Sequence, residues 1–173
     1  KGSFGSIHGP TISTLSKEPN WSINRLRTFL FEGYLGDIIG NPLKKGIAEG
    51  ELLISNLTIF CFLIGTNDMP NCEGKIIIFE DVNEDIYKID RMFTYIRMTQ
   101  VLKNIVGIGF GNFFDPKRTD KIELLENLIF DRFAEFNIPI ISNLPVGHLT
   151  GNACLPYGYS GILNGNIGKL SIN

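Results

Sequence analysis

Two ionisable side chains in this chain have the types and positions that acid–base chemistry requires. Glu80 directly follows the apolar run IIIF, and His148 ends the motif PVGH in a stretch rich in Gly and Pro. A histidine can take up and return a proton near neutral pH, and a carboxylate can orient it, as in a catalytic triad. Ser160 lies in GYSG, but it lacks the strand–turn–helix context of a nucleophile elbow. The residues therefore predict the base and the orienter of a hydrolase whose nucleophile lies elsewhere.

Each of these two residues also has a simpler interpretation. An acid at the end of a strand commonly caps the next helix or meets solvent, and a lone loop histidine is commonly a surface residue. Position alone favours the simpler interpretation for both Glu80 and His148. Asp81 follows Glu80 directly, but successive side chains of a strand point to opposite faces, so only one of the two acids can face a given cleft. This argues against a glycosidase that uses paired carboxylates.

Metal and nucleotide chemistry find little support in the sequence. His8, in HGP, is the only other histidine, and neither histidine has a cysteine or carboxylate at ligand spacing beside it. Gly107, Gly109 and Gly111 resemble a phosphate-binding loop, but no Lys-Ser/Thr follows them and no helix begins there. These glycines instead indicate a close backbone approach or the start of a loop. We expect no metal and no cofactor.

Composition and charge narrow the class of protein further. The 173 residues include 16 basic and 18 acidic ones, scattered rather than banded, so a nucleic-acid partner is not expected. The longest apolar run, residues 57–65, is far shorter than the roughly 20 residues that cross a bilayer, so no membrane partner is expected either. Three cysteines without C-x-x-C pairing favour the reducing cytoplasm. The length favours a single domain.

Strands and helices must bring these side chains into position. Compact apolar or β-branched runs predict strands over residues 51–55, 75–79, 104–110 and 139–142, and shorter β segments over 153–155, 161–163 and 169–172. The run at 75–79 has the pattern of a strand buried on both faces. Asn164-Gly165 predicts a hairpin turn between the last two segments, and these closing segments would form a small β-meander.

Helices are predicted where apolar residues recur at helical spacing. The predicted helices cover residues 21–34, a short stretch after Asn56 that ends near Gly65, 86–101 and 120–136. Asn20 is the expected N-cap of the first helix, and Gly33 lies beyond its last turn. Strand–helix–strand passages followed by hairpins predict an α/β fold with a mixed sheet. Residues 1–20 read as a connecting segment from a missing N-terminal domain, because the chain opens at Lys1 without a methionine or signal segment.

Eight short motifs, taken in order, resemble the C-terminal domain of the LD-carboxypeptidase family, whose members are serine peptidases. They are HGP at 8–10, SNL at 55–57, GT at 65–66, KIIIFEDV at 75–82, YKIDR at 87–91, GIGFG at 107–111, and PVGH with LPYG within 145–158. The resemblance runs nearly from end to end of the chain. It implies a swivelling-type β/β/α domain with a mixed sheet over residues 21–173.

The resemblance also implies an activity and roles for particular residues. A flavodoxin-like N-terminal domain of the same polypeptide would supply the nucleophilic serine and the oxyanion donors. Glu80 would then be the orienter and His148 the general base. The substrate would be the murein tetrapeptide, trimmed of its terminal D-Ala in the cytoplasm during peptidoglycan recycling. Asn56 would contact the substrate, although Ile54-Ser55 stand where the family commonly has Gly-Gly.

Two other functions remain open at the level of sequence. Close relatives confer immunity to microcin C by cleaving a peptide–nucleotide bond, and a tryptophan able to stack on the base would favour that activity. Trp21 is the only tryptophan and lies outside the matched motifs. The chain could alternatively be a non-catalytic binding domain, since it carries no nucleophile of its own. A homodimer and the identity of the substrate also remain open.

Overall fold

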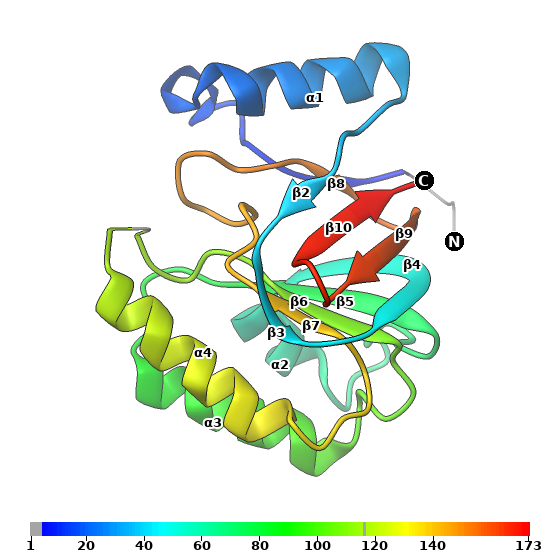
Figure 1. Cartoon of the computed structure of the whole chain (residues 1–173), viewed down its shortest axis with the longest axis vertical. Coiled ribbons are helices and arrows are strands. Elements are labelled where there is room, and N and C mark those ends of the chain that lie inside the picture. Colours follow the sequence, from blue (N-terminus) through cyan, green and yellow to red (C-terminus); the bar gives the residue numbers. More distant parts are fainter. Residues whose placement is uncertain (1–4, 116) are drawn as a thin grey trace.

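The computed structural model describes residues 5–115 and 117–173, and its centre is an eight-stranded mixed sheet (Figure 1). The strands, in order across the sheet, are β2 (Ile38–Ile39), β10 (Lys169–Ile172), β9 (Ser160–Asn164), β4 (Ile47–Asn56), β5 (Lys75–Glu80), β6 (Gly107–Phe110), β7 (Ile140–Ser142) and β3 (Asn41–Lys44). Strands β4 to β7 are parallel, and the outer strands pair antiparallel. The predicted α/β class with a mixed sheet is confirmed.

The helices lie on two sides of this sheet. They are α1 (Asn20–Glu32), α2 (Leu57–Leu63), α3 (Ile86–Thr99) and α4 (Thr119–Phe133). Helices α2, α3 and α4 pack on one face, whereas α1 lies at the other end of the molecule, beyond β2 and β8 (Figure 1). A separate two-stranded sheet pairs β1 (Ile7–His8) with β8 (Leu155–Pro156). Among the described residues, no helix is both long and apolar enough to cross a membrane.

Strand β5 divides the hydrophobic core into two layers. Ile77 and Phe79 belong to the cluster under α2, α3 and α4, and Ile76 and Ile78 belong to the cluster on the opposite face. All four side chains are inaccessible to solvent, so the prediction of a strand buried on both faces is confirmed. Burial of each such side chain stabilises the fold by about 1.5–3 kcal/mol. The strand that ends at Glu80 is therefore held rigidly from both sides.

Helices α3 and α4 end at Thr99 and Phe133, two and three residues before the predicted ends, and the ends of α1 and α2 follow the local signals with one exception. Gly33 adopts the left-handed conformation (φ 69°) after α1, as its place in the sequence predicts. The N-cap of α1 is Pro19, however, and not Asn20, which is already the first helical residue. Asn56 lies at the corner between β4 and α2, as predicted, and its side chain accepts a hydrogen bond from the Ile59 N–H at 3.1 Å.

Several strands differ from the sequence-based expectation. Strand β4 starts at Ile47 rather than 51, β6 starts at Gly107 rather than 104, and β1, β2 and β3 were not predicted. The closing segments do not form one meander, because β8 pairs with β1 while β9 and β10 join the main sheet. The predicted hairpin between the last two segments is present, but Asn164 is the last residue of β9 and the connection to β10 spans residues 165–168. Strands of two residues show no hydrophobic period, so their pairing depends on partners distant in sequence.

Candidate active site

Glu80 and His148 meet at the carboxyl end of β5, although 68 positions separate them in sequence. The distance between Glu80 Oε2 and His148 Nδ1 is 2.7 Å. A carboxylate can only accept hydrogen bonds, so Nδ1 carries the hydrogen and Nε2 keeps its lone pair. The Glu80 side chain is buried, whereas that of His148 is about half exposed (54%). This leaves an oriented imidazole that is partly open to solvent, and the contact expected between the two residues is present.

Glu80, the last residue of β5, and Asp81, which follows it, point to opposite faces of the sheet. Glu80 points to the side that carries Val146 and the His148 loop. Asp81 points to the helical side, where its carboxylate accepts hydrogen bonds from the Thr58 N–H at 3.0 Å and the Thr58 hydroxyl at 2.8 Å. The expectation that only one of the acids faces the cleft is thus met. Asp81 therefore stabilises the start of α2, and Glu80 binds His148.

Two glycines let the His148 loop lie close to Glu80. Gly147 has φ 142°, and a Cβ there would lie 3.1 Å from Glu80 Oε2 and 3.0 Å from the Asn112 carbonyl oxygen. A Cβ on Gly111 would lie 2.2 Å from the Val146 carbonyl oxygen. The interpretation of the Gly107–Gly111 cluster as a close backbone approach therefore holds at Gly111. Glycine is required at both positions because a side chain would separate the loop from the strand.

The chain between residues 18 and 22 fixes the rest of this loop. The Glu18 carboxylate accepts hydrogen bonds from the N–H groups of Gly151 (2.9 Å) and Asn152 (3.1 Å). The Ser22 hydroxyl donates to the Asn152 carbonyl oxygen at 2.7 Å. The Asn152 side chain in turn accepts from the Gly147 N–H at 3.2 Å, next to His148. These hydrogen bonds restrain the backbone both before and after His148, and so restrain the position of its ring.

The charge of Glu80 is set by opposing effects. Burial acts to raise the pKa of this carboxyl, but contacts with His8 and His148 outweigh it, so the pKa lies below its ordinary value of 4.5. Glu80 is accordingly ionised at neutral pH. An ionised carboxylate at Nδ1 stabilises positive charge on the ring when Nε2 accepts a proton. The pair can therefore act as a general base.

His8 is a residue of this site to which sequence reasoning assigned no role. Its Nε2 lies 3.5 Å from Glu80 Oε1, and its side chain is about a quarter exposed (24%). The motif HGP was visible in the sequence, but nothing local connected it with a carboxylate 72 positions away. His8 and His148 both line a small cavity of about 80 Å³.

The other residues considered from sequence have different surroundings. Asn56 pairs with Glu80 in the parallel register of β4 and β5, and its amide donates to Asp81 at 3.1 Å. Ser160 begins β9 and lies 3.5 Å from Glu49, with no helix following it. Burial raises the pKa of the Cys61 thiol to about 11, so it makes a poor nucleophile near neutral pH. Within the described residues, no three His, Cys, Asp or Glu side chains gather to hold a metal ion.

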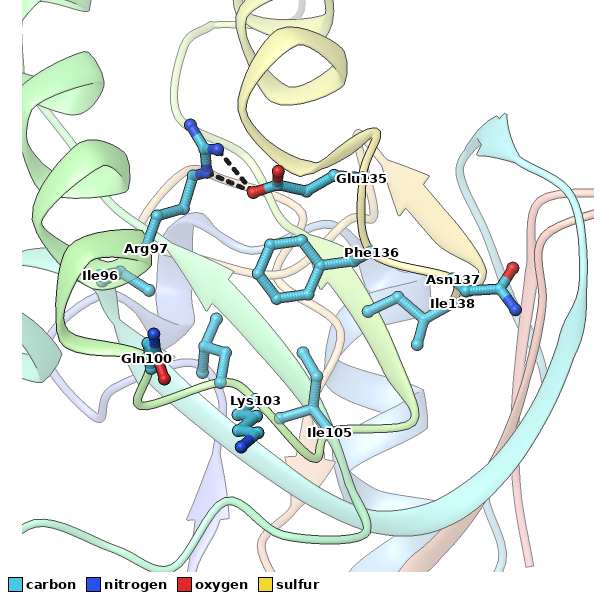
Figure 2. Close-up of a pocket in the computed structure, with 10 residues that line it drawn as sticks. Ile96, Arg97, Gln100, Lys103, Ile105, Glu135, Phe136, Asn137 and Ile138 are labelled. Carbon is cyan, nitrogen blue, oxygen red and sulfur yellow. Dashed lines mark hydrogen bonds and ion pairs between the residues drawn. The ribbon is translucent and has the colours of Figure 1, made fainter.

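A larger hollow of about 570 Å³ lies at the other end of the parallel strands, away from Glu80 and His148. Figure 2 shows the residues that line it. Its lining includes Ile105, just before β6, and Ile138, just before β7, so it opens at the amino ends of the parallel strands. The Arg97 guanidinium donates to Glu135 at 2.9 Å across its rim, which pairs both charges (Figure 2). Ligand sites in open α/β sheets form at the carboxyl ends of strands, where Glu80 and His148 lie.

The fold and the site define an α/β domain in which a carboxylate orients a histidine at the carboxyl end of the parallel strands. Residues 49–163 match the family model of the LD-carboxypeptidase C-terminal domain. A putative carboxypeptidase of Synechocystis is 39% identical over 96% of this chain and 56% of its own length. The murein tetrapeptide carboxypeptidase of Pseudomonas aeruginosa is 30% identical over 93% of this chain and 56% of its own length. The chain belongs to the LD-carboxypeptidase family, as the resemblance predicted.

Solved structures agree on the fold. The muramoyltetrapeptide carboxypeptidase of Oxalobacter formigenes superposes with a TM-score of 0.81, at 24% identity, over 97% of this chain and 60% of that one. The microcin self-immunity protein MccF, in complex with aspartyl sulfamoyl adenosine, gives a TM-score of 0.78 at 16% identity, over 96% of this chain and 60% of that one. The chain thus spans rather more than half the length of these relatives.

Proposed function

We propose that this chain is the His- and Glu-supplying half of a serine LD-carboxypeptidase, which releases the terminal D-Ala of murein tetrapeptides in the cytoplasm. The 2.7 Å contact between Glu80 and His148 is the observation that carries the proposal. Its second support is membership of a family that includes a murein tetrapeptide carboxypeptidase. In this proposal the nucleophilic serine belongs to an N-terminal domain of the same polypeptide.

The proposed reaction follows from the orientation of the ring. His148 Nε2 takes the serine proton as the serine oxygen attacks the carbonyl carbon of the L,D peptide bond. The imidazolium, stabilised by Glu80, then gives that proton to the nitrogen of the departing D-Ala. Water, activated by the same histidine, hydrolyses the acyl-enzyme and regenerates the serine. The oxyanion donors would come from the N-terminal domain, as the family resemblance implies.

The test measures D-Ala release from a murein tetrapeptide by the full-length protein and two variants. His148→Ala should lower kcat by about 10⁴ or more, and Glu80→Gln by a smaller factor of about 10²–10⁴, because the acid acts through orientation and charge. Asp85→Asn is the matched control, since Asp85 is an exposed acid just beyond the same strand end. Thermal melts show whether each variant is folded. Full turnover in folded His148→Ala would refute the proposal.

One observation favours the microcin-type activity as a second candidate. Trp21 is about half exposed (47%), and a ring carbon of it lies 3.2 Å from where a Cβ on Gly151 would be. Its ring therefore packs on the loop that follows His148 and keeps area free for stacking on a planar group. Comparing kcat/KM for a tetrapeptide and for an aminoacyl sulfamoyl adenosine separates the two activities. Binding of either ligand without turnover would instead indicate a non-catalytic binding domain.

A further inference from the structure

The carboxylate of Glu80 faces two histidines, one at each oxygen. Oε2 contacts His148 at 2.7 Å, and Oε1 lies 3.5 Å from His8 Nε2. Oε1 accepts no hydrogen bond of standard geometry from the described residues, so the His8 ring is the polar group that faces it. A buried ionised carboxylate is stable only when polar or charged groups compensate both oxygens.

The backbone of β1 sets the position of the His8 ring. His8 pairs with Leu155 in the small antiparallel sheet, and Leu155 is fully buried. A Cβ on the next residue, Gly9, would lie 2.9 Å from the Cβ of Cys154, the residue before β8, so the chain stays closely packed just beyond β1. The imidazole is therefore presented to Glu80 by a paired strand, and not by a free terminus.

The same segment of chain reaches both members of the proposed catalytic pair. His8 lies beside Glu80, and ten residues later Glu18 binds two backbone N–H groups of the His148 loop. Contacts with both histidines also keep the Glu80 pKa low in spite of burial. Packing of β1 alone does not require a polar ring at position 8. The direction of His8 Nε2 toward Glu80 Oε1 therefore indicates a role for the imidazole.

We propose that His8 is a positioning residue, which holds Oε1 of Glu80 so that Oε2 stays directed at His148 Nδ1. For this it keeps a hydrogen on Nε2 and donates toward the carboxylate. It acts through Glu80 and does not itself touch the reacting atoms. The inference rests on the proposed function, in which Glu80 orients His148.

The test uses the full-length protein with three substitutions of His8 and one control. The Gln amide reaches about as far as Nε2 and can donate, the Asn amide is too short, and the Leu side chain has no donor. We expect His8→Leu and His8→Asn to lower kcat roughly tenfold with KM unchanged, and His8→Gln to recover most of the loss. Ile12→Ala, at a side chain 95% exposed in the same segment, should match the wild type.

A spectroscopic readout keeps this inference separate from the proposed activity. The hydrogen that His148 Nδ1 shares with Glu80 should give a downfield proton resonance, which His148→Ala removes. In His8→Leu and His8→Asn this resonance should move upfield or broaden, and in His8→Gln and Ile12→Ala it should stay. An unmoved resonance and wild-type kcat in folded His8→Asn would overturn the inference while leaving the proposed function intact. If the wild type hydrolyses no tetrapeptide, the proposed function fails and the resonance alone decides whether His8 positions Glu80.

Discussion

Replacing Gly147 by alanine should misalign the proposed catalytic pair without touching either of its side chains. The new Cβ would lie 3.1 Å from Glu80 Oε2 and 3.0 Å from the Asn112 carbonyl oxygen, both tighter than ordinary van der Waals contact. The carboxylate or the loop must then shift by a few tenths of an ångström. Because the hydrogen bond to His148 is only 2.7 Å long, such a shift weakens it directly.

The structure gives the size of this effect in two parts. An alanine at φ 142° occupies a region that favours glycine, which costs about 1–3 kcal/mol of folding stability. At roughly 2–4 °C per kcal/mol, a cost of about 2 kcal/mol lowers Tm by about 4–8 °C. A displacement of about 1 Å can cost a factor of about 100 in rate, so the smaller shift here should lower kcat by about 10–100-fold. KM should change little, because the added Cβ would meet Glu80 and Asn112.

The assay is D-Ala release by the full-length protein at a temperature well below both melting points. Gly33→Ala is the matched control, since Gly33 also has a positive φ (69°) but a Cβ there would meet nothing within 4 Å. It should lose stability through backbone strain and keep its kcat. If Gly147→Ala lost no more kcat than Gly33→Ala, the close packing of the loop on Glu80 would have no catalytic consequence.

Three further predictions concern the isolated chain, pH and Asn56. The 173-residue chain alone should fold but release no D-Ala, because it has neither the proposed nucleophile nor the oxyanion donors; turnover by the purified chain would contradict the two-domain mechanism. The folded-state pKa of Glu80 is below its ordinary value of 4.5, so its contribution to stability is complete above pH 4.5 and is lost as pH falls through the folded-state pKa. Denaturant unfolding at a series of pH values should therefore show the wild-type advantage over Glu80→Gln shrinking below pH 4.5, and a constant advantage would place the charge effect elsewhere. Asn56→Ser keeps an N-cap for α2 but loses the amide hydrogen bond to Asp81, so Tm should fall by a few degrees, and KM should rise if the amide contacts substrate as the family resemblance implies; an unchanged KM would leave Asn56 with its structural contacts to α2 and Asp81 alone.

Local sequence was sufficient for the strand that carries Glu80 and for the longer helices. The run from Lys75 to Phe79 predicted a strand buried on both faces, and the alternation of that strand separated the roles of Glu80 and Asp81. Helical spacing predicted α3 and α4, and the position of Gly33 predicted the end of α1. These features depend on residues close together in sequence, so the spacing of apolar residues is enough to predict them.

Only the tertiary structure decided how distant residues combine around Glu80. The Glu80–His148 pair was expected through a family resemblance, whereas the approach of His8 and the contacts of Glu18 with the His148 loop had no signal in the sequence. They follow from the two-residue pairing of β1 with β8 and from the order of strands in the sheet. Such short strands have no hydrophobic period that a sequence pattern could reveal. The residues that meet at the ends of the strands depend on which strands pair, and not on how far apart the residues are along the chain.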